Sequence, residues 1–118
     1  MAHLYISAAH KSSGKTSVSV GLAGALTNRD LAVQMFKKGP DYIDPLWLGC
    51  ASGRACFNLD FFTMSHDEIR NTFATHSASS DISLIEGNKG LFDGVDVDGA
   101  DCNAALAKFL SAPVLLVI

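Results

Sequence analysis

Apolar positions along the chain fall into two kinds of segment. Short apolar runs bounded by turn residues predict strands at 3–9, 31–37, 82–87 and 114–118. Apolar residues at helical spacing predict helices at 16–28, directly after Pro45, from 65 to about 76, and from 101 to 110. Because strands alternate with helices, we expect an α/β protein whose mostly parallel sheet is covered by helices on both faces.

Two of the predicted helices carry start signals. Ser65 is followed three residues later by Glu68, which predicts a capping box, and Asp101 is expected to cap the last helix. The final strand, 114–118, is apolar at every position, which is typical of a strand buried within a parallel sheet and followed by a covering helix. No helix follows it within the 118 residues, so we expect the chain to be the front part of a longer protein.

Composition narrows the class of protein. With 48 % hydrophobic and 18 % charged residues, the chain is expected to form one compact domain. Its net charge of −3 and its nine scattered lysines and arginines disfavour nucleic acid as a partner. The longest apolar run is too short to cross a bilayer and the N-terminus lacks a signal-peptide pattern, so we expect a cytosolic protein that does not bind membranes.

Cysteine and aromatic residues are expected to serve packing. The three cysteines are an odd number in a chain expected to be intracellular, which disfavours a disulfide framework, and they lack zinc-site spacing. We therefore interpret Cys50, Cys56 and Cys102 as small buried apolar residues. Four aromatic residues could line a ligand pocket, but we favour core packing for them: Trp47, Phe57, Phe61 and Phe62.

The segment 8–16, AAHKSSGKT, lies between the first predicted strand and the first predicted helix. This is the context of a phosphate-binding loop, in which backbone N–H groups and the helix N-terminus face the phosphates of a nucleotide. Lys15 would reach the β- and γ-phosphates, and the Thr16 hydroxyl would ligate Mg²⁺. The predicted nucleotide-binding residues are Ser12, Ser13, Gly14, Lys15, Thr16 and Ser17.

Position 9 departs from the usual loop pattern, which has glycine where this chain has Ala9. If this residue had to adopt a positive φ, its Cβ would cost roughly 1 kcal/mol. Each charge-assisted hydrogen bond to a phosphate contributes about 1.5–3 kcal/mol, so we expect the loop to function with alanine.

Three carboxylates follow predicted strands and could serve a metal ion. Asp41 and Asp44 come after the second strand, and Glu86 lies near the end of the third. In open parallel sheets ligands bind beyond the carboxyl ends of the strands, so all three are expected near the phosphate loop. A turn role stays open for the two aspartates, since Gly-Pro-Asp and Asp-Pro are common turn sequences. We favour a functional role for Asp41 and a metal or water-orienting role for Glu86.

Two longer motifs, KKGPDYIDP at 37–45 and EGNKGLFDG at 86–94, make the chain resemble the cobyrinic acid a,c-diamide synthase family. Members of that family are ATP- and glutamine-dependent amidotransferases that amidate acetate side chains of a tetrapyrrole. The resemblance implies a P-loop NTPase-like fold similar to dethiobiotin synthetase, with residues 1–118 as the truncated N-terminal part of the ATP-binding domain. It also implies ATP and Mg²⁺ as cofactors, a tetrapyrrole substrate, and a C-terminal glutaminase domain, outside these 118 residues, that supplies ammonia. A homodimer is left open.

Carried over by position, the resemblance assigns roles to individual residues. Lys15, Asp41 and Glu86 are expected to be catalytic, and Thr16, Asp41 and Glu86 to hold Mg²⁺. The residues expected near the substrate are Tyr42, Asp44, Leu91 and Asp93. In the implied reaction, the γ-phosphoryl group moves onto a substrate carboxylate to form an acyl phosphate, which ammonia then attacks.

Four alternatives stay open at this point. Ala8, Ala9 and Lys89 depart from the family pattern, which leaves room for a relative that amidates sirohaem. A dethiobiotin-synthetase-like ligase without a glutaminase partner would share the fold but would not need the GPDYIDP segment. A partitioning ATPase is disfavoured because His10 stands where such loops carry a signature lysine. The last alternative is a phosphate-binding module that has no turnover by itself.

Overall fold

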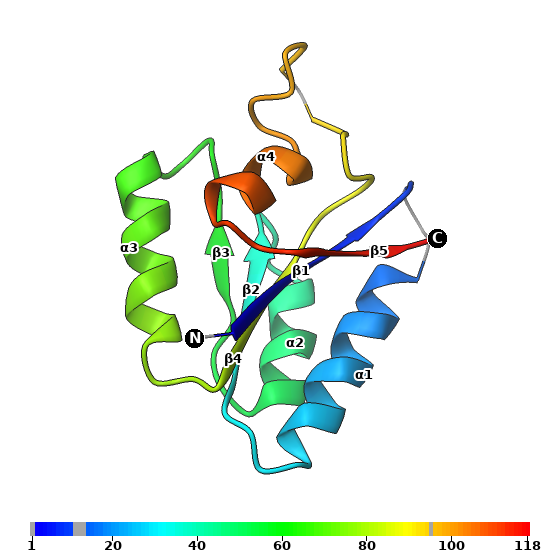
Figure 1. The fold of residues 1–118 in the computed structure, drawn as a ribbon, viewed down its shortest axis with the longest axis vertical. Helices are drawn as coiled ribbons and strands as arrows, with labels where there is room; N and C mark the ends of the chain where they lie inside the picture. Colours follow the sequence, from blue (N-terminus) through cyan, green and yellow to red (C-terminus); the bar gives the residue numbers. More distant parts are fainter. Residues whose placement is uncertain (1, 11–13, 95) are drawn as a thin grey trace.

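The computed structural model describes residues 2–10, 14–94 and 96–118, in which strands and helices alternate along the chain (Figure 1). The strands are β1 (Ala2–Ala8), β2 (Val33–Lys38), β3 (Phe57–Leu59), β4 (Ile82–Glu86) and β5 (Val114–Val117). The helices are α1 (Lys15–Thr27), α2 (Asp44–Ser52), α3 (His66–Ser77) and α4 (Asn103–Phe109).

These strands form a single parallel sheet of order β3-β2-β4-β1-β5. The central strand β4 pairs with β1 on one side and with β2 on the other, and the register places Lys37 of β2 beside Glu86 of β4. Because parallel strands all end at the same edge, the carboxyl ends of β1, β2 and β4 lie together there. The predicted α/β class with a parallel sheet is confirmed.

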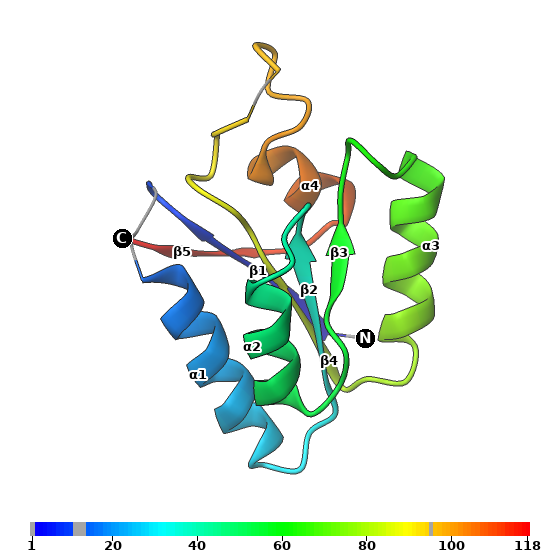
Figure 2. The same cartoon turned by 180° about the vertical axis from the view of Figure 1, so that it is seen from behind.

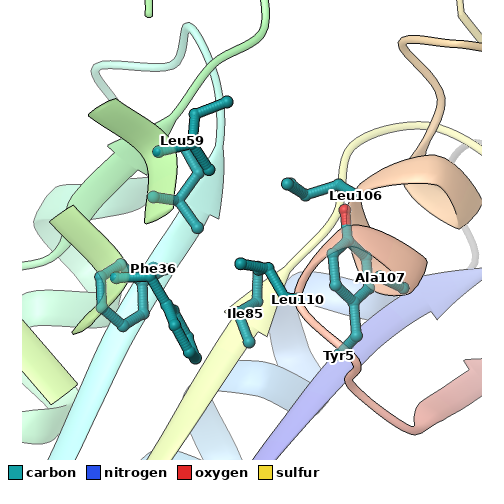
Figure 3. Close-up of a cluster of buried hydrophobic side chains, with 9 residues drawn as sticks. Tyr5, Phe36, Leu59, Ile85, Leu106, Ala107 and Leu110 are labelled. Carbon is teal, nitrogen blue, oxygen red and sulfur yellow. The ribbon is translucent and has the colours of Figure 1, made fainter. Parts of the chain in front are cut away.

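Two apolar clusters, one on each face of the sheet, form the core. One cluster joins the sheet to α1 and α2, which are seen best in Figure 2; its buried members are Ile6, Ala23, Val33, Met35, Leu48 and Leu84. The other joins the sheet to α3 and α4 (Figure 3) and contains Tyr5, Phe36, Leu59, Ile69, Phe73, Ile85, Leu106, Ala107 and Leu110. Since successive side chains of a strand point to opposite faces, neighbours such as Leu84 and Ile85 belong to different clusters. Helices therefore cover both faces, as predicted.

The two predicted helix caps have different outcomes. At α3 the capping box is confirmed: the Ser65 hydroxyl accepts a hydrogen bond from the Glu68 N–H, and the Glu68 carboxylate accepts one from the Ser65 N–H. At α4 the prediction is wrong, because the helix begins at Asn103 and its N-cap residue is Cys102, which makes no side-chain capping bond. Asp101 instead accepts a hydrogen bond from the Asp96 N–H and closes the preceding loop.

Among the described residues β5 is an edge strand that pairs only with β1, and its side chains from Val114 to Leu116 are about 40 % exposed. The predicted covering of this strand by a later helix stays a prediction. Core packing is wrong for two of the four aromatic residues. Phe57 and Phe61 pack partly against the core, whereas Trp47 and Phe62 are 61 % and 62 % exposed. Strand β3 had no counterpart in the sequence analysis, since a strand of three residues is too short to show a periodic pattern.

The cysteines differ from one another in burial. Cys102 is buried, Cys56 is half-buried and packs against the core cluster under α1 and α2, and Cys50 is exposed, so the expected packing role is wrong only for Cys50. All three thiols are free. Burial raises the pKa of the Cys56 thiol to about 12, which keeps it protonated at neutral pH. No helix in the described part of the chain is long and apolar enough to span a membrane.

Candidate phosphate and metal site

The first helix begins with the geometry of an anion-binding helix terminus. Gly14 is the N-cap of α1 and has a left-handed backbone, with φ +86° and ψ 17°, which glycine adopts without strain. No side chain among the described residues caps this end of the helix, and the first turn has no acidic residue. The first N–H groups of an uncapped helix are free to bind an anion, and the helix dipole favours negative charge there. This end of α1 therefore suits a phosphate group.

The three predicted serines of the phosphate loop and Ala9 have different outcomes. Ser12 and Ser13 lie outside the described residues. Ser17 is exposed in the first turn of α1. Ala9 is not among the residues with a positive φ, and its N–H donates to the carbonyl of Val117. The strain considered for alanine at this position therefore does not arise.

Glu86 connects this helix terminus to the sheet. It is the last residue of β4, and its side chain is fully buried. The Thr16 hydroxyl donates to Glu86 Oε1 over 3.1 Å. The second carboxylate oxygen, Oε2, is buried and has no hydrogen-bond partner among the described residues. A buried carboxylate oxygen without a partner is costly, so it is a natural ligand position for a cation.

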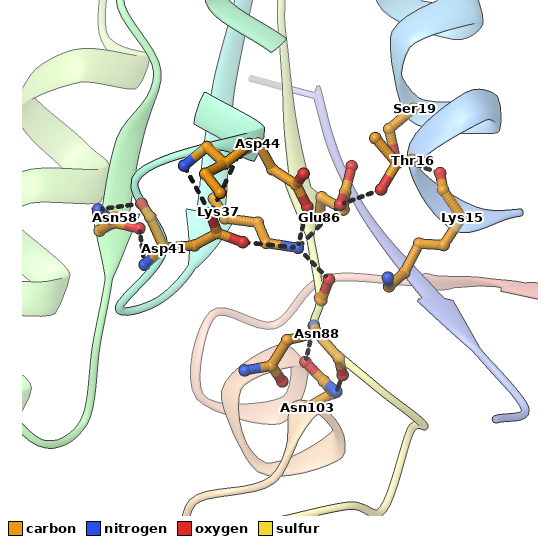
Figure 4. A network of polar contacts seen from close by, with 12 residues as sticks. Lys15, Thr16, Ser19, Lys37, Asp41, Asp44, Asn58, Glu86, Asn88 and Asn103 are labelled. Carbon is orange, nitrogen blue, oxygen red and sulfur yellow. Dashed lines mark hydrogen bonds and ion pairs between the residues drawn. The ribbon is translucent and has the colours of Figure 1, made fainter. Parts of the chain in front are cut away.

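Lys37 lies at the centre of the charged cluster. Its ammonium is 2.8 Å from Glu86 Oε1 and donates to the carbonyl of Gly87 over 2.9 Å. On the other side it is 3.2 Å from Asp44 Oδ2 and 3.9 Å from Asp41 Oδ2 (Figure 4). The side chain is 2 % exposed, so three carboxylates balance one buried cation.

The sequence analysis missed Lys37. A signal for it exists, because a lysine that continues the apolar strand LAVQMF must either be exposed or find a buried partner. The partner could not be read from the sequence, because it depends on the register between β2 and β4, where Lys37 and Glu86 are neighbours.

Asp41 has the turn role that the sequence left open, and it also faces the charged cluster; its catalytic role stays a prediction. Its Oδ1 atom accepts hydrogen bonds from the backbone N–H groups of Ile43 and Asp44, which is the turn role. Its Oδ2 atom faces Lys37. The amide of Asn58 fixes the Asp41 backbone, donating to its carbonyl over 3.0 Å and accepting from its N–H over 3.3 Å. This segment is therefore held rigidly at the carboxyl end of β2.

Lys15 is close enough to the same cluster for the charges of the cluster to shift its pKa. Partial burial lowers the pKa of its ammonium, and the like charge of Lys37 lowers it further. The carboxylates of Glu86, Asp44 and Asp41 act in the opposite direction. An anion bound beside Lys15, such as a phosphate, would stabilise the charged form of its ammonium.

A magnesium ion bound with a nucleotide fits the oxygen atoms present. Among the described residues no group of three or more Asp, Glu, His or Cys side chains is arranged as a metal site. Nucleotide-bound Mg²⁺, however, needs only one or two protein oxygens and completes its octahedron with phosphate oxygens and water. The Thr16 hydroxyl and the orphaned Oε2 of Glu86 meet that need. A metal contact from Asp41 stays a prediction.

The loop after β4 is anchored by a buried amide that the sequence analysis did not identify. Asn103, at the start of α4, accepts hydrogen bonds from the Tyr5 hydroxyl and from the Asn88 N–H. Its side-chain NH₂ group donates to the carbonyls of Asn88 and Gly90. The loop is also tied to β1, because the Leu91 N–H donates to the carbonyl of Ala8 over 2.8 Å. Asn103 thus positions the loop beside the end of β1, where the predicted phosphate-binding segment, residues 8–16, begins.

The residues expected near the substrate lie around this loop and the Asp41 segment. Leu91 is half-buried, and Asp93 is exposed and accepts a hydrogen bond from the Gly90 N–H. Tyr42 is 80 % exposed and Asp44 begins α2. The structure therefore brings Lys15, Thr16 and the three carboxylates together and leaves the Tyr42 and Asp93 side chains at the surface around them.

Comparison with known proteins decides the family. The chain is 57 % identical over 115 residues to the cobyrinate a,c-diamide synthase of Magnetococcus marinus, a match that covers 98 % of this chain and 25 % of the relative. It is 47 % identical over 116 residues to the enzyme of the same name from Syntrophotalea carbinolica, with 98 % and 25 % covered. The hydrogenobyrinate a,c-diamide synthase of Rhodobacter capsulatus is 42 % identical over 118 residues, with 98 % and 27 % covered. Over the length that it spans, the chain belongs to the cobyrinate a,c-diamide synthase family.

The chain spans about a quarter of the length of these cobyrinate a,c-diamide synthases. No protein-family model matches it. The motifs by which the sequence resembled the family lie next to each other in the structure, since KKGPDYIDP contains Lys37, Asp41 and Asp44 and EGNKGLFDG begins with their neighbour Glu86. The resemblance to the cobyrinate a,c-diamide synthase family is confirmed.

Proposed function

We propose that the protein to which this chain belongs amidates acetate carboxylates of cobyrinate or hydrogenobyrinate, using ATP with Mg²⁺ and ammonia derived from glutamine. The names of the relatives support the substrate class. The observation that carries the ATP-dependent part is the hydrogen bond from Thr16 to Glu86. It joins a helix terminus suited to phosphate to a buried carboxylate with one unpartnered oxygen.

Each residue of the site has a part in this proposal. The N–H groups at the start of α1 and the Lys15 ammonium bind the terminal phosphates and offset the negative charge that spreads over the γ-phosphoryl oxygens. Thr16 and Glu86 hold Mg²⁺, which when bound neutralises phosphate charge. Lys37 holds the Glu86 carboxylate in place, since removal of this ammonium would leave a carboxylate buried without a counter-charge.

The chemistry follows from the low reactivity of a carboxylate. A carboxylate oxygen of the tetrapyrrole attacks the γ-phosphorus, the bond to the β-phosphate oxygen breaks, and ADP leaves. Ammonia then attacks the carbonyl carbon of the resulting acyl phosphate, inorganic phosphate leaves, and the nitrogen loses a proton to give the amide. The first step needs mainly in-line positioning and charge neutralisation, which fixed backbone N–H groups and lysines provide.

The position of the chain in the whole protein is part of the proposal. We place residues 1–118 in the ATP-binding domain and assign ammonia production to a glutaminase domain elsewhere in the protein. The chain's length relative to its relatives is consistent with this arrangement. The names of the relatives favour cobyrinate or hydrogenobyrinate over the sirohaem, dethiobiotin and partitioning alternatives.

Replacement of Lys15 tests the proposed role of the phosphate site. In the full-length protein, Lys15→Ala is expected to lower tetrapyrrole-dependent ADP release by about 100-fold or more, the usual loss when one donor to a developing charge is removed. A coupled assay for ADP with cobyrinate and glutamine measures the rate. Lys108→Ala is the matched control, because Lys108 is an exposed lysine of α4. Unchanged turnover in Lys15→Ala would refute the assignment.

A further inference from the structure

Lys38 is a second buried lysine at the end of β2, on the face opposite to Lys37. Its side chain is 5 % exposed. Because strand residues alternate between faces, it points toward the side of the sheet that carries α3 and α4. Unlike Lys37, its ammonium has no hydrogen bond and no carboxylate within ion-pair distance among the described residues. A lysine in this position needs an explanation.

Burial disfavours the charged form of Lys38. Burial lowers the pKa of the ammonium, and the charges of Asp101 and Asp60 partly oppose that shift from a distance. Asp60 is not free to approach, because its carboxylate accepts the Phe62 N–H over 2.9 Å and the Thr63 hydroxyl over 2.6 Å. The nearest acidic side chains therefore stabilise the ammonium weakly, and a ligand carboxylate could do so directly.

Lys38 lines a cavity of about 110 Å³ at the carboxyl edge of the sheet. Such a volume holds roughly three to four water molecules at about 30 Å³ each, or one short carboxylate side chain. Asn88, Lys89 and Asp93 of the loop after β4 form another wall. The cavity thus offers the ammonium groups of Lys38 and Lys89 and the side-chain amide of Asn88 to an incoming anion, beside the carboxylates of Asp93 and Asp101.

The cavity adjoins a wider hollow with aromatic walls. Phe62 and Asp101 line both the small cavity and a hollow of about 480 Å³, to which Phe61 and His66 also contribute. Phe62 is 62 % exposed, which is unusual for a phenylalanine and leaves its ring open to a flat apolar ligand. A lysine-lined cavity beside an aromatic hollow suits a ring that carries carboxylate arms.

The loop 87–94 separates this cavity from the phosphate site. Its residues Asn88, Lys89 and Asp93 face the cavity, while its Leu91 N–H bonds to Ala8, at the start of the phosphate-binding segment. The same loop thus borders both places, and a tetrapyrrole carries several carboxylate arms, so different arms are available to the two sides of the loop.

We propose that Lys38 binds, in this cavity, a carboxylate of the substrate that is not the one being phosphorylated, while Phe62 packs against the macrocycle. This inference rests on the proposed function, because it assumes a polycarboxylate ring as substrate. Lys38 then acts as a specificity residue that fixes the orientation of the ring and so decides which acetate arm lies beside the phosphate site.

Kinetics of Lys38→Met in the full-length protein test the proposal. We expect the KM for cobyrinate to rise at least tenfold, with kcat changed less than twofold and the KM for ATP unchanged, since Lys38 and Lys15 serve opposite sides of the loop. Methionine keeps most of the aliphatic stem and removes a charge that burial disfavours, so the midpoint of urea unfolding should not fall. Lys38→Arg should retain most of the affinity, and Lys108→Met, an exposed lysine of α4, should behave as wild type.

The outcomes separate the two proposals. A wild-type protein that does not amidate cobyrinate or hydrogenobyrinate would refute the proposed function. An active wild type whose cobyrinate KM is unchanged in Lys38→Met would overturn only the carboxylate site, as would an equal rise of the KM values for cobyrinate and ATP. If Lys38→Met unfolds at a lower urea concentration than wild type, the same KM measurements are made on Lys38→Gln. This variant also loses the charge but keeps a polar end.

Discussion

At the scale of single residues, the main feature is a buried ion pair that belongs to the site itself. Lys37 and Glu86 are almost fully buried, and their charged atoms are 2.8 Å apart. Burial of two charges costs about as much as their attraction returns, so such a pair contributes little net stability, whereas loss of one member leaves an uncompensated charge. The pair is better explained by function, since it fixes the carboxylate that also accepts the Thr16 hydroxyl.

Substitution of Lys37 should therefore be costly. We expect Lys37→Met to lower the free energy of unfolding by about 3–5 kcal/mol, the usual loss when one partner of a buried pair is removed. Hydrogen exchange of the β2 and β4 amides in the full-length protein measures the change. The double variant Lys37→Met/Glu86→Gln should recover much of the loss, because no charge is then left buried. A loss below about 1 kcal/mol in the single variant would show that Glu86 does not depend on Lys37.

Sequence reasoning reached some of these residues and not others. Lys15, Thr16 and Glu86 were predicted because their neighbours in the chain define them, through a loop motif and a strand end. Lys37 was missed because its partner lies 49 positions away and is set by strand register. Asn103 was missed for the same reason, since its four hydrogen-bond partners lie in β1 and in the loop after β4.

At the scale of elements, α4 and β1 hold the loop after β4 in place. The Asn103 side chain is completely buried and uses both its oxygen and its NH₂ group. A Cβ at Gly87 would lie 2.5 Å from Asn103 Oδ1, so the close approach of the loop also requires glycine at this position. The loop that carries Leu91 and Asp93 is therefore held rather than free.

Replacement of the Asn103 amide by a carboxylate tests whether this side chain holds the loop in place. Asn103→Asp keeps the oxygen that Tyr5 and Asn88 bond to but replaces the donor to two loop carbonyls with a second oxygen, which repels them. We expect kcat/KM for cobyrinate to fall at least tenfold, or about 1.4 kcal/mol. Gln34→Glu is the matched control, because Gln34 is a buried amide that donates to the carbonyls of Met35 and Ala55, toward the other end of β2.

The comparison of these two variants decides the role of Asn103. Both should lose stability, as read from urea unfolding, but only Asn103→Asp should lose kcat/KM. If both variants lose activity in proportion to their loss of stability, Asn103 has only a structural role.

The helices and strands themselves were largely predictable, and the exceptions have physical reasons. Apolar periodicity located the four helices and the longer strands to within two residues at most ends. The start of α4 was misplaced because the Asp101 carboxylate accepts a hydrogen bond from the preceding loop instead of capping the helix. The sequence pattern does not show which of these two bonds an aspartate will make.

At the scale of the whole molecule, the parallel topology makes the site. Strands β2, β4 and β1 are neighbours in the sheet, and three parts of the site follow them at the same edge: Lys37 with Asp41 and Asp44, Glu86 with its loop, and the predicted phosphate-binding segment. The sequence predicted this arrangement because alternating strands and helices allow few topologies. It could not predict the exposure of β5, because an apolar strand has the same pattern whether it lies inside a sheet or at its edge.

The transfer of oxygen from substrate to phosphate tests the central claim that the site activates a carboxylate with ATP. The full-length protein would be given cobyrinate labelled with ¹⁸O in its acetate carboxylates, together with ATP, Mg²⁺ and glutamine, and the phosphate released would be analysed by mass spectrometry. An acyl phosphate carries one carboxylate oxygen to phosphorus, so we predict one ¹⁸O in inorganic phosphate for each amide formed. Inorganic phosphate without ¹⁸O, at normal amide yield, would contradict the account.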